Sequence, residues 1–77
     1  MTEVEKDSKV VRVTVNGVSH SFPPPVSLSQ LLAFMDLHGR RGMAVAVNGT
    51  VVPAAHWTSY LLQDSDSVLI VHAVQGG

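Results

Sequence analysis

The group in this sequence most open to chemistry lies at its C-terminus, Val74-Gln75-Gly76-Gly77. Terminal glycines add nothing to a core, and glycine loses more conformational freedom on ordering than any other residue. They do provide a narrow backbone, able to enter a channel that no Cβ could pass, with a free carboxylate at Gly77. Four extended residues reach about 13 Å. The ending therefore suggests a carboxylate presented to another protein, although an ordinary chain end is the competing interpretation.

Other candidate sites are weaker. The histidines lack the spacing of metal ligands, and no carboxylate recurs beside them at helical period; they are His20, His38, His56 and His72. Asp64 and Asp66 resemble a paired acid, but acids around a tight turn before a strand are far commoner. There is no cysteine, hence no thiolate, persulfide or disulfide within the chain. No glycine-rich phosphate loop or Ser/His/Asp motif is recognisable, so we expect a protein that is not itself an enzyme and binds no metal or cofactor.

Size and charge set further bounds. The 77 residues suit one small domain, and the 45% hydrophobic content must carry its stability. A net charge of −1 argues against binding nucleic acid or an anionic membrane, and no apolar run is long enough to span a bilayer. Residues 1–9 are charged without an apolar segment, so we interpret them as a flexible leader rather than a signal peptide. We expect a cytoplasmic protein, monomeric when free.

Two β-hairpins are predicted around Asn-Gly pairs, whose turn positions need positive φ. Val10–Val15 alternates apolar and polar residues, Asn16-Gly17 turns the chain, and the second strand runs from Val18 to Phe22 before the prolines. A two-residue loop pairs Val15 with Val18, Val13 with His20 and Val11 with Phe22. Downstream, strands 43–47 and 50–52 flank Asn48-Gly49 in the same way.

One helix is predicted between the hairpins. Ser27 and Gln30 form a capping-box pattern, and Val26 and Leu31 have the spacing of a hydrophobic staple. The apolar stripe consists of Leu28, Leu31, Leu32 and Met35. We expect the helix to run to His38 and to end at Gly39 in the left-handed conformation, with Arg40 and Arg41 beyond it.

The remaining chain predicts a connector and a final strand. Residues 54–62 suggest one or two helical turns, with Trp57 and Leu61 sealing the core. Residues 67–73 are apolar at almost every position, which is expected for a strand that is buried on both faces or is central in its sheet. We expect an α+β fold of the β-grasp (ubiquitin-like) kind, a mixed sheet of four to five strands with one main helix on one face. The domain would span residues 10–73, followed by a flexible tail at 74–77.

Several motifs together resemble the ThiS family of sulfur carriers in thiamine thiazole synthesis. They are V-R-V-T-V-N-G, V-S-L-S-Q-L-L, V-A-V-N-G-T-V-V-P with tryptophan four residues after the proline, and the terminal V-Q-G-G. The resemblance covers about residues 10–77. It departs from the family at Ala54, often arginine there, and at Ser65, usually the glycine of a D-G-D turn. The first departure bears on partner contacts and the second on turn geometry.

The resemblance implies a mechanism. A ThiF-type adenylyltransferase would join the Gly77 carboxylate to AMP from ATP, because an unactivated carboxylate is a poor electrophile. A sulfur donor, such as a persulfide protein, would displace AMP and leave a thiocarboxylate on Gly77, from which a ThiG-type thiazole synthase would take the sulfur. Gly76, Gln75 and Val74 would thread into the partners' sites.

Alternative functions remain open at this point. One is a related carrier, either the small subunit of molybdopterin synthase or a carrier for cysteine or siderophore synthesis. Another is a ubiquitin-like modifier joined to protein lysines. The last is an interaction module whose glycines have no role.

Overall fold

The computed structural model describes residues 9–37 and 41–72. Its elements follow the predicted hairpin–helix–hairpin–strand order. They are β1 (Val11–Val15), β2 (Val18–Phe22), α1 (Leu28–Phe34), β3 (Met43–Val47), β4 (Thr50–Val51), the 3₁₀ helix η2 (Ala54–His56) and β5 (Asp66–His72). No helix among these residues is long and apolar enough to cross a membrane.

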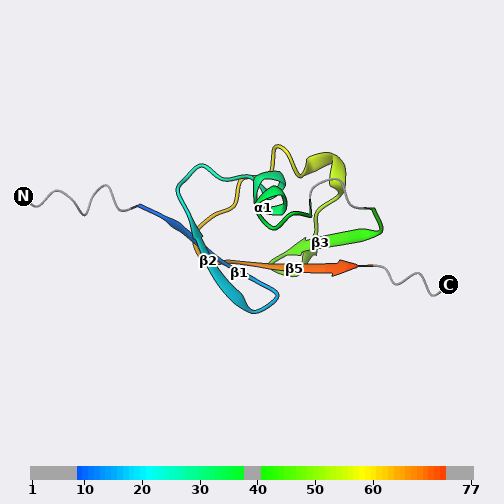
Figure 1. Cartoon of the computed structure of the whole chain (residues 1–77), viewed down its shortest axis with the longest axis horizontal. Helices are drawn as coiled ribbons and strands as arrows, with labels where there is room; N and C mark the ends of the chain where they lie inside the picture. Colours follow the sequence, from blue (N-terminus) through cyan, green and yellow to red (C-terminus); the bar gives the residue numbers. More distant parts are fainter. Residues whose placement is uncertain (1–8, 38–40, 73–77) are drawn as a thin grey trace, which may run out of the picture.

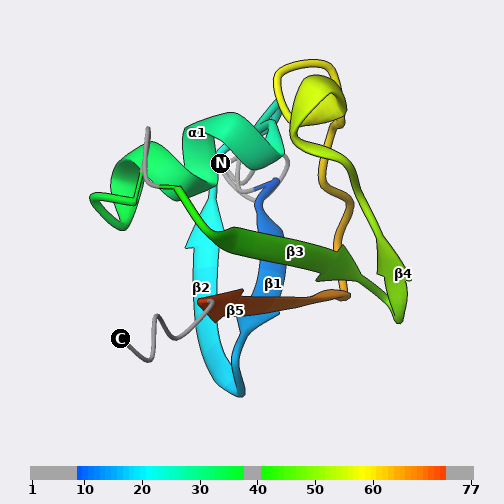
Figure 2. The same cartoon turned by 90° about the vertical axis from the view of Figure 1, so that its right-hand side faces the viewer.

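The strands form one mixed five-stranded sheet in the order β2-β1-β5-β3-β4. The last strand is central, as predicted: β5 runs parallel to β1 and antiparallel to β3. α1 and the connector that contains η2 lie on one face of this sheet, and no described element covers the other face (Figures 1 and 2). This is the expected β-grasp arrangement.

Both predicted hairpin turns are present. Asn16 and Asn48 have φ of 51° and 53°, and the glycines after them have φ of 87° and 86°. The register of the first hairpin, Val11 with Phe22 through Val15 with Val18, is the predicted one. β4 ends at Val51, one residue earlier than expected, although the Val52 amide still donates to the Val45 carbonyl oxygen at 2.8 Å.

The start of α1 is confirmed in detail, but its end is not. The Gln30 amide donates to Ser27 Oγ at 3.1 Å, and the Ser27 amide donates to Gln30 Oε1 at 2.8 Å. The prediction of a helix to His38 was wrong: α1 ends at Phe34, and Asp36 adopts the left-handed conformation with φ of 62°. Aspartate tolerates this conformation better than most side chains, so the helix ends without glycine. Gly39 and Arg40 lie outside the described residues.

The core lies between α1 and the covered face of the sheet. Its buried side chains are Val11, Val13, Val15, Val26, Leu28, Leu31, Leu32, Val45, Val47, Val52, Leu62, Val68 and Ile70. Trp57 packs against this core as predicted, but the prediction for Leu61 was wrong: it is 55% exposed, whereas Leu62 is 4% exposed. The segment is extended here, bridging Ser27 at Leu61, so consecutive side chains point in opposite directions and only Leu62 faces inward.

Of the two alternatives for the last strand, the central position is confirmed and burial on both faces is not. Val68 and Ile70 are buried, but Leu69 and Val71 are 53% and 50% exposed. β5 is central within the sheet, yet one helix covers only one of its faces. The apolar residues on the other face therefore remain in contact with solvent.

Candidate functional site

The predicted reacting residue and its neighbours, Gly77, Gly76, Gln75 and Val74, lie outside the described residues. The structure does describe the strand that precedes them in the chain. β5 ends at His72, and residues 73–77 follow it directly. The candidate site therefore consists of the C-terminal half of β5 and the surface around it.

β3 pairs with one edge of β5 from Val68 to the end of the strand. The register runs from Val47 opposite Val68 to Met43 opposite His72. On the other edge, β1 pairs with β5 only from Val13 opposite Asp66 to Val15 opposite Val68. Beyond Val68 the β1 chain turns away into its hairpin, so the half of β5 nearest the C-terminus has a backbone ladder on one side.

Two hairpin asparagines contact β5 with their side chains. Asn16 Nδ2 donates to the Ile70 carbonyl oxygen at 3.1 Å, and the Ile70 amide donates to Asn16 Oδ1 at 2.8 Å. Asn48 acts near the start of the strand, where its Oδ1 accepts from the Ser67 amide at 2.9 Å. The sequence analysis interpreted both only as turn residues. Asparagine is a preferred first residue of such turns for its tolerance of positive φ, so the Asn-Gly pattern carries no signal of this second role.

The acidic turn before β5 is structural, as predicted. Asp64 Oδ1 accepts from the Arg12 amide at 2.9 Å, and the two side chains form an exposed ion pair, which contributes little to stability. Asp66 accepts from the Gln63 amide at 2.8 Å and from Asn48 Nδ2 at 2.9 Å. Between the acids, Ser65 has φ of 76°, a conformation that glycine would adopt at lower cost.

The uncovered face of the sheet carries an apolar strip beside the base of the tail. Residues directly opposite each other on neighbouring strands project to the same face. Leu69 lies opposite Ala46, Val71 opposite Ala44, and Val51 opposite Ala46 on its other side. We call these five residues the apolar strip.

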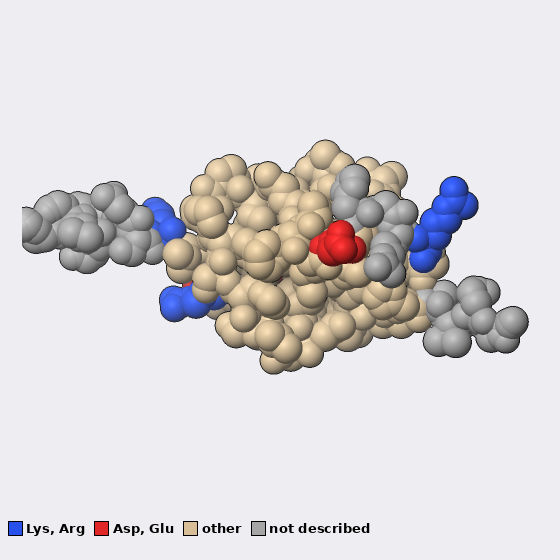
Figure 3. Space-filling view, in the orientation of Figure 1, with Lys and Arg blue, Asp and Glu red and all other residues tan. Residues whose placement is uncertain are grey.

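The rest of the uncovered face is polar. Thr14 lies opposite Ser67 and Ser19, and Arg12 lies opposite Ser21. The apolar strip is therefore confined to the half of the sheet made by β5, β3 and β4. On the face shown in Figure 3, lysine and arginine are visible only towards the two ends, and a small acidic group lies between them.

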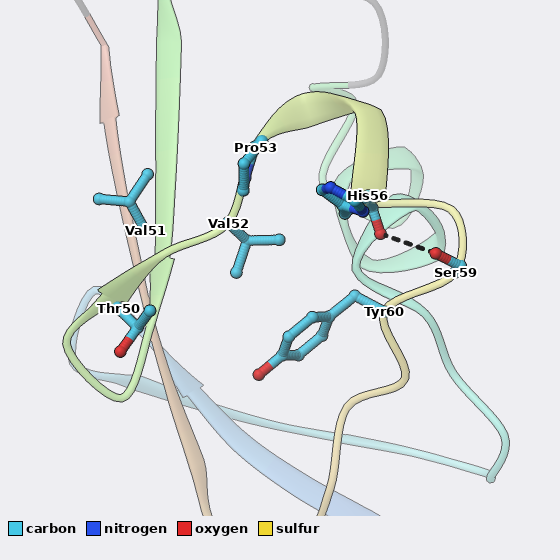
Figure 4. A pocket seen from close by; sticks show the side chains of 7 residues that line it. All are labelled: Thr50, Val51, Val52, Pro53, His56, Ser59 and Tyr60. Atoms are coloured by element: carbon cyan, nitrogen blue, oxygen red, sulfur yellow. Dashed lines mark hydrogen bonds between the residues drawn. The ribbon is translucent and has the colours of Figure 1, made fainter.

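A hollow with a volume of about 310 Å³ lies between β4 and the connector. Thr50, Val51, Val52, Pro53, His56, Ser59 and Tyr60 line it (Figure 4). The Ser59 hydroxyl donates to the backbone oxygen of His56 at 3.3 Å rather than to an imidazole nitrogen. Serine and histidine are thus not arranged as a nucleophile and base in this hollow.

The described histidines do not converge. His20 stacks on Phe22 with ring centroids 6.2 Å apart and meets the edge of Phe34 at 6.0 Å, which makes it part of an aromatic cluster at the β2 edge. Within residues 9–37 and 41–72, no group of histidine, aspartate and glutamate side chains could hold a metal ion.

The fold and the position of β5 define a class of protein: a β-grasp domain whose central last strand leads to the C-terminal residues. A model of the ThiS family matches residues 13–77, and the chain belongs to that family.

The chain is also similar to individual proteins. The chain is 31% identical over 70 residues to the uncharacterized protein ycf40 of Porphyra purpurea, covering 91% of this chain and 97% of that one. It is 31% identical over 51 residues to the sulfur carrier protein ThiS of Escherichia coli (strain K12), covering 66% and 76%. The crystal structure of the thiamine biosynthesis protein (ThiS) from Geobacter metallireducens superposes with a TM-score of 0.72 at 22% identity, over 87% of this chain and all of the other. That likeness shows the shared fold.

Proposed function

We propose that this protein is a sulfur carrier that bears the transferred sulfur on the carboxyl group of Gly77. The observation that carries the proposal is the extent of the family match, which continues through residue 77 and so includes Gly76-Gly77. The 31% identity to a protein named as a sulfur carrier supports it. In this role the chain is a co-substrate of its partner enzymes and not a catalyst.

The chemistry proceeds in two steps. The Gly77 carboxylate attacks the α-phosphate of ATP in a ThiF-type adenylyltransferase, forming an acyl adenylate and releasing pyrophosphate. Hydrosulfide, or the terminal sulfur of a persulfide, then attacks the acyl carbon, and AMP leaves. Hydrosulfide gives the thiocarboxylate directly. A persulfide gives an acyl disulfide, from which a second thiol releases the thiocarboxylate by taking the other sulfur into a disulfide.

The absence of cysteine from the chain is consistent with this chemistry, because the sulfur is carried on a backbone carbonyl carbon. ATP is used by the activating enzyme. The carrier itself needs only to present a carboxylate on a backbone narrow enough to enter the enzyme's site.

The apolar strip is the surface we propose for docking the adenylyltransferase. Part of it lies on β5, the strand that leads to Gly77. Burying its exposed aliphatic side chains, Leu69, Val71 and Val51, against a partner would stabilise the complex through the hydrophobic effect. Docking there would place His72 close to the enzyme. The remaining five residues would then extend at most about 17 Å into the active site.

The sulfur acceptor we propose is a ThiG-type thiazole synthase. This choice rests on the family to which the chain belongs, and molybdopterin synthase is the alternative acceptor in the test below.

The test is mass spectrometry of the intact protein after incubation with its cognate adenylyltransferase, ATP and sulfide. We expect a mass gain equal to the replacement of one oxygen atom by sulfur, located at Gly77 by fragmentation. A verified cognate enzyme that leaves the mass unchanged would refute the carrier function. The thiocarboxylate form, offered separately to thiazole synthase and to the large subunit of molybdopterin synthase, should lose its sulfur only to the former.

A further inference from the structure

The inference concerns how the C-terminal half of β5 is held on its β1 side. The Asn16 amide donates to the Val68 carbonyl oxygen at 2.9 Å, which is the last backbone contact of the parallel β1–β5 pair. At Asn16 the backbone then enters the hairpin turn with positive φ. Among the described residues, the next hydrogen bonds on this edge of β5 are the two between the Asn16 carboxamide and Ile70.

These two bonds have the form of a continued parallel ladder. In such a ladder the Ile70 amide would donate to the backbone oxygen of residue 16, and the Ile70 oxygen would accept from an amide further along the same strand. Here Oδ1 takes the first role at 2.8 Å and Nδ2 takes the second at 3.1 Å. The side chain thus stands where the next peptide group would be, after the chain itself has turned away.

Asn48 provides an internal comparison. It occupies the same position in the second hairpin, has nearly the same φ of 53°, and also contacts β5 with its carboxamide. Its partners, however, are Ser67 and Asp66, at the N-terminal end of the strand. At that end β1 pairs with β5 on one side, with Thr14 opposite Ser67, and the β3 pairing begins only at Val68. Asn48 therefore extends the contact on the β3 side of β5, at the end of the strand remote from the C-terminus.

We propose that Asn16 is a positioning residue: its carboxamide holds Ile70–His72 in the sheet and so fixes the place from which the reacting C-terminus leaves the domain. The part that concerns the reaction rests on the proposed carrier function. We call the two hydrogen bonds between Asn16 and Ile70 the clamp. Leu69 and Val71 of the apolar strip flank Ile70 on the same strand, so the clamp also fixes the position of the proposed docking surface.

The structural arm compares Asn16→Gly with Asn48→Gly. Glycine accepts the positive φ at both turns and removes only the carboxamide, so each variant is the control for the other. The measurement is native-state hydrogen exchange by NMR on the full chain. The informative amide is that of Val71, which is paired with Ala44 of β3 and makes no contact with Asn16 that the substitution removes directly.

In Asn16→Gly we expect the Ile70 and Val71 amides to exchange faster by a factor of roughly 5 to 30, as the loss of one or two net hydrogen bonds implies. Asn48→Gly should accelerate Ser67 and leave Val71 unchanged once its global stability is taken into account. The proposal that Asn16 holds this part of β5 would be wrong if the Val71 amide exchanged equally faster in the two variants, or no faster in Asn16→Gly.

Asn16→Asp tests the geometry further. The ionised aspartate retains the turn conformation and an acceptor for the Ile70 amide, but it has no donor and places a negative charge against the Ile70 oxygen. We expect Val71 to exchange at least as fast as in Asn16→Gly at neutral pH. Protection equal to that of the unchanged chain would show that the Nδ2 bond does not matter, contrary to the proposal.

The functional arm measures pyrophosphate release during adenylation of each variant. For Asn16→Gly we expect KM for the carrier to rise by about threefold or more with a smaller change in kcat, because part of the population must be reordered on docking. Asn48→Gly should stay close to the unchanged chain. Equal KM values for the two variants would refute the role in presentation. If the unchanged chain is not adenylated, the proposed function is wrong. Hydrogen exchange still tests whether Asn16 holds the C-terminal half of β5.

Discussion

The indole Nε1 of Trp57 donates a hydrogen bond of 2.7 Å to the backbone oxygen of Val52. Between them, Pro53 precedes η2, whose single turn reverses the chain and returns the tryptophan to the end of β4. The backbone oxygen of Trp57 also accepts from the Ser29 amide at 3.1 Å, at the first turn of α1. Trp57 therefore links β4 to the helix, and its distance of four residues from Pro53 suits the single turn of η2 between them.

Replacing Trp57 with phenylalanine should destabilise the protein by about 1–2 kcal/mol, because it keeps an aromatic ring but leaves the Val52 oxygen without its donor. Chemical denaturation measures the change. Trp57→Ala should cost more, about 3 kcal/mol or above, through the loss of packing. Equal stabilities for the phenylalanine variant and the unchanged chain would show that the indole hydrogen bond contributes nothing.

Ser65→Gly should stabilise the protein. Ser65 has φ of 76°, and relief of this conformation outweighs the extra freedom that glycine gives the unfolded chain, for a net gain of about 0.5 kcal/mol. The melting temperature measures the gain. Ser65→Ala is the control, since it removes the hydroxyl but retains the Cβ, and it should give no increase.

Leu69→Asp should weaken adenylation while the domain remains folded. Leu69 is 53% exposed in the apolar strip, so an aspartate there is tolerated in the free protein but must be desolvated at an apolar interface. We expect KM for the carrier to rise by tenfold or more, on the order of 1.4 kcal/mol of lost binding. The measurement is pyrophosphate release at increasing carrier concentration.

Val18→Asp is the matched control, because Val18 is 59% exposed but lies at the β1–β2 turn, away from the apolar strip. It should leave KM near that of the unchanged chain. A similar rise in KM for both variants would place docking elsewhere or indicate a general effect of charge.

Substitutions in the tail should affect activation and not folding. Gly76→Val adds a branched side chain to a backbone that we expect to pass a narrow channel, and adding one residue after Gly77 moves the carboxylate away from ATP. Both variants should give no detectable acyl adenylate, with circular dichroism and melting temperature unchanged. Normal AMP transfer by the extended variant would contradict the threading of the tail.

Local features of this protein were determined by its sequence. The turns at Asn16-Gly17 and Asn48-Gly49 and the capping box at Ser27 depend on residues a few positions apart, whose side chains and backbone preferences act directly on one another. The two hairpins, the helix start and the central final strand were therefore predictable, and with them the β-grasp fold. The terminal glycines likewise suggested the carrier chemistry that we propose, without any structure.

Other features depend on contacts between distant segments. The core takes Leu62 instead of Leu61, because the bridge from Leu61 to Ser27 sets the direction of both side chains. Sequence pattern could not specify that bridge, since the partners are brought together only by the folded chain.

The tertiary structure alone decided how β5 is presented. Its largely apolar sequence suggested either burial on both faces or a central position. The strand is central, but a single helix covers one face and leaves Leu69 and Val71 exposed. The Asn16 carboxamide reaches Ile70, 54 positions away in the chain, because the parallel pairing of β1 with β5 ends at that turn. Periodicity shows which residues are apolar, whereas the packing of neighbouring elements determines which of them are covered and which polar groups meet.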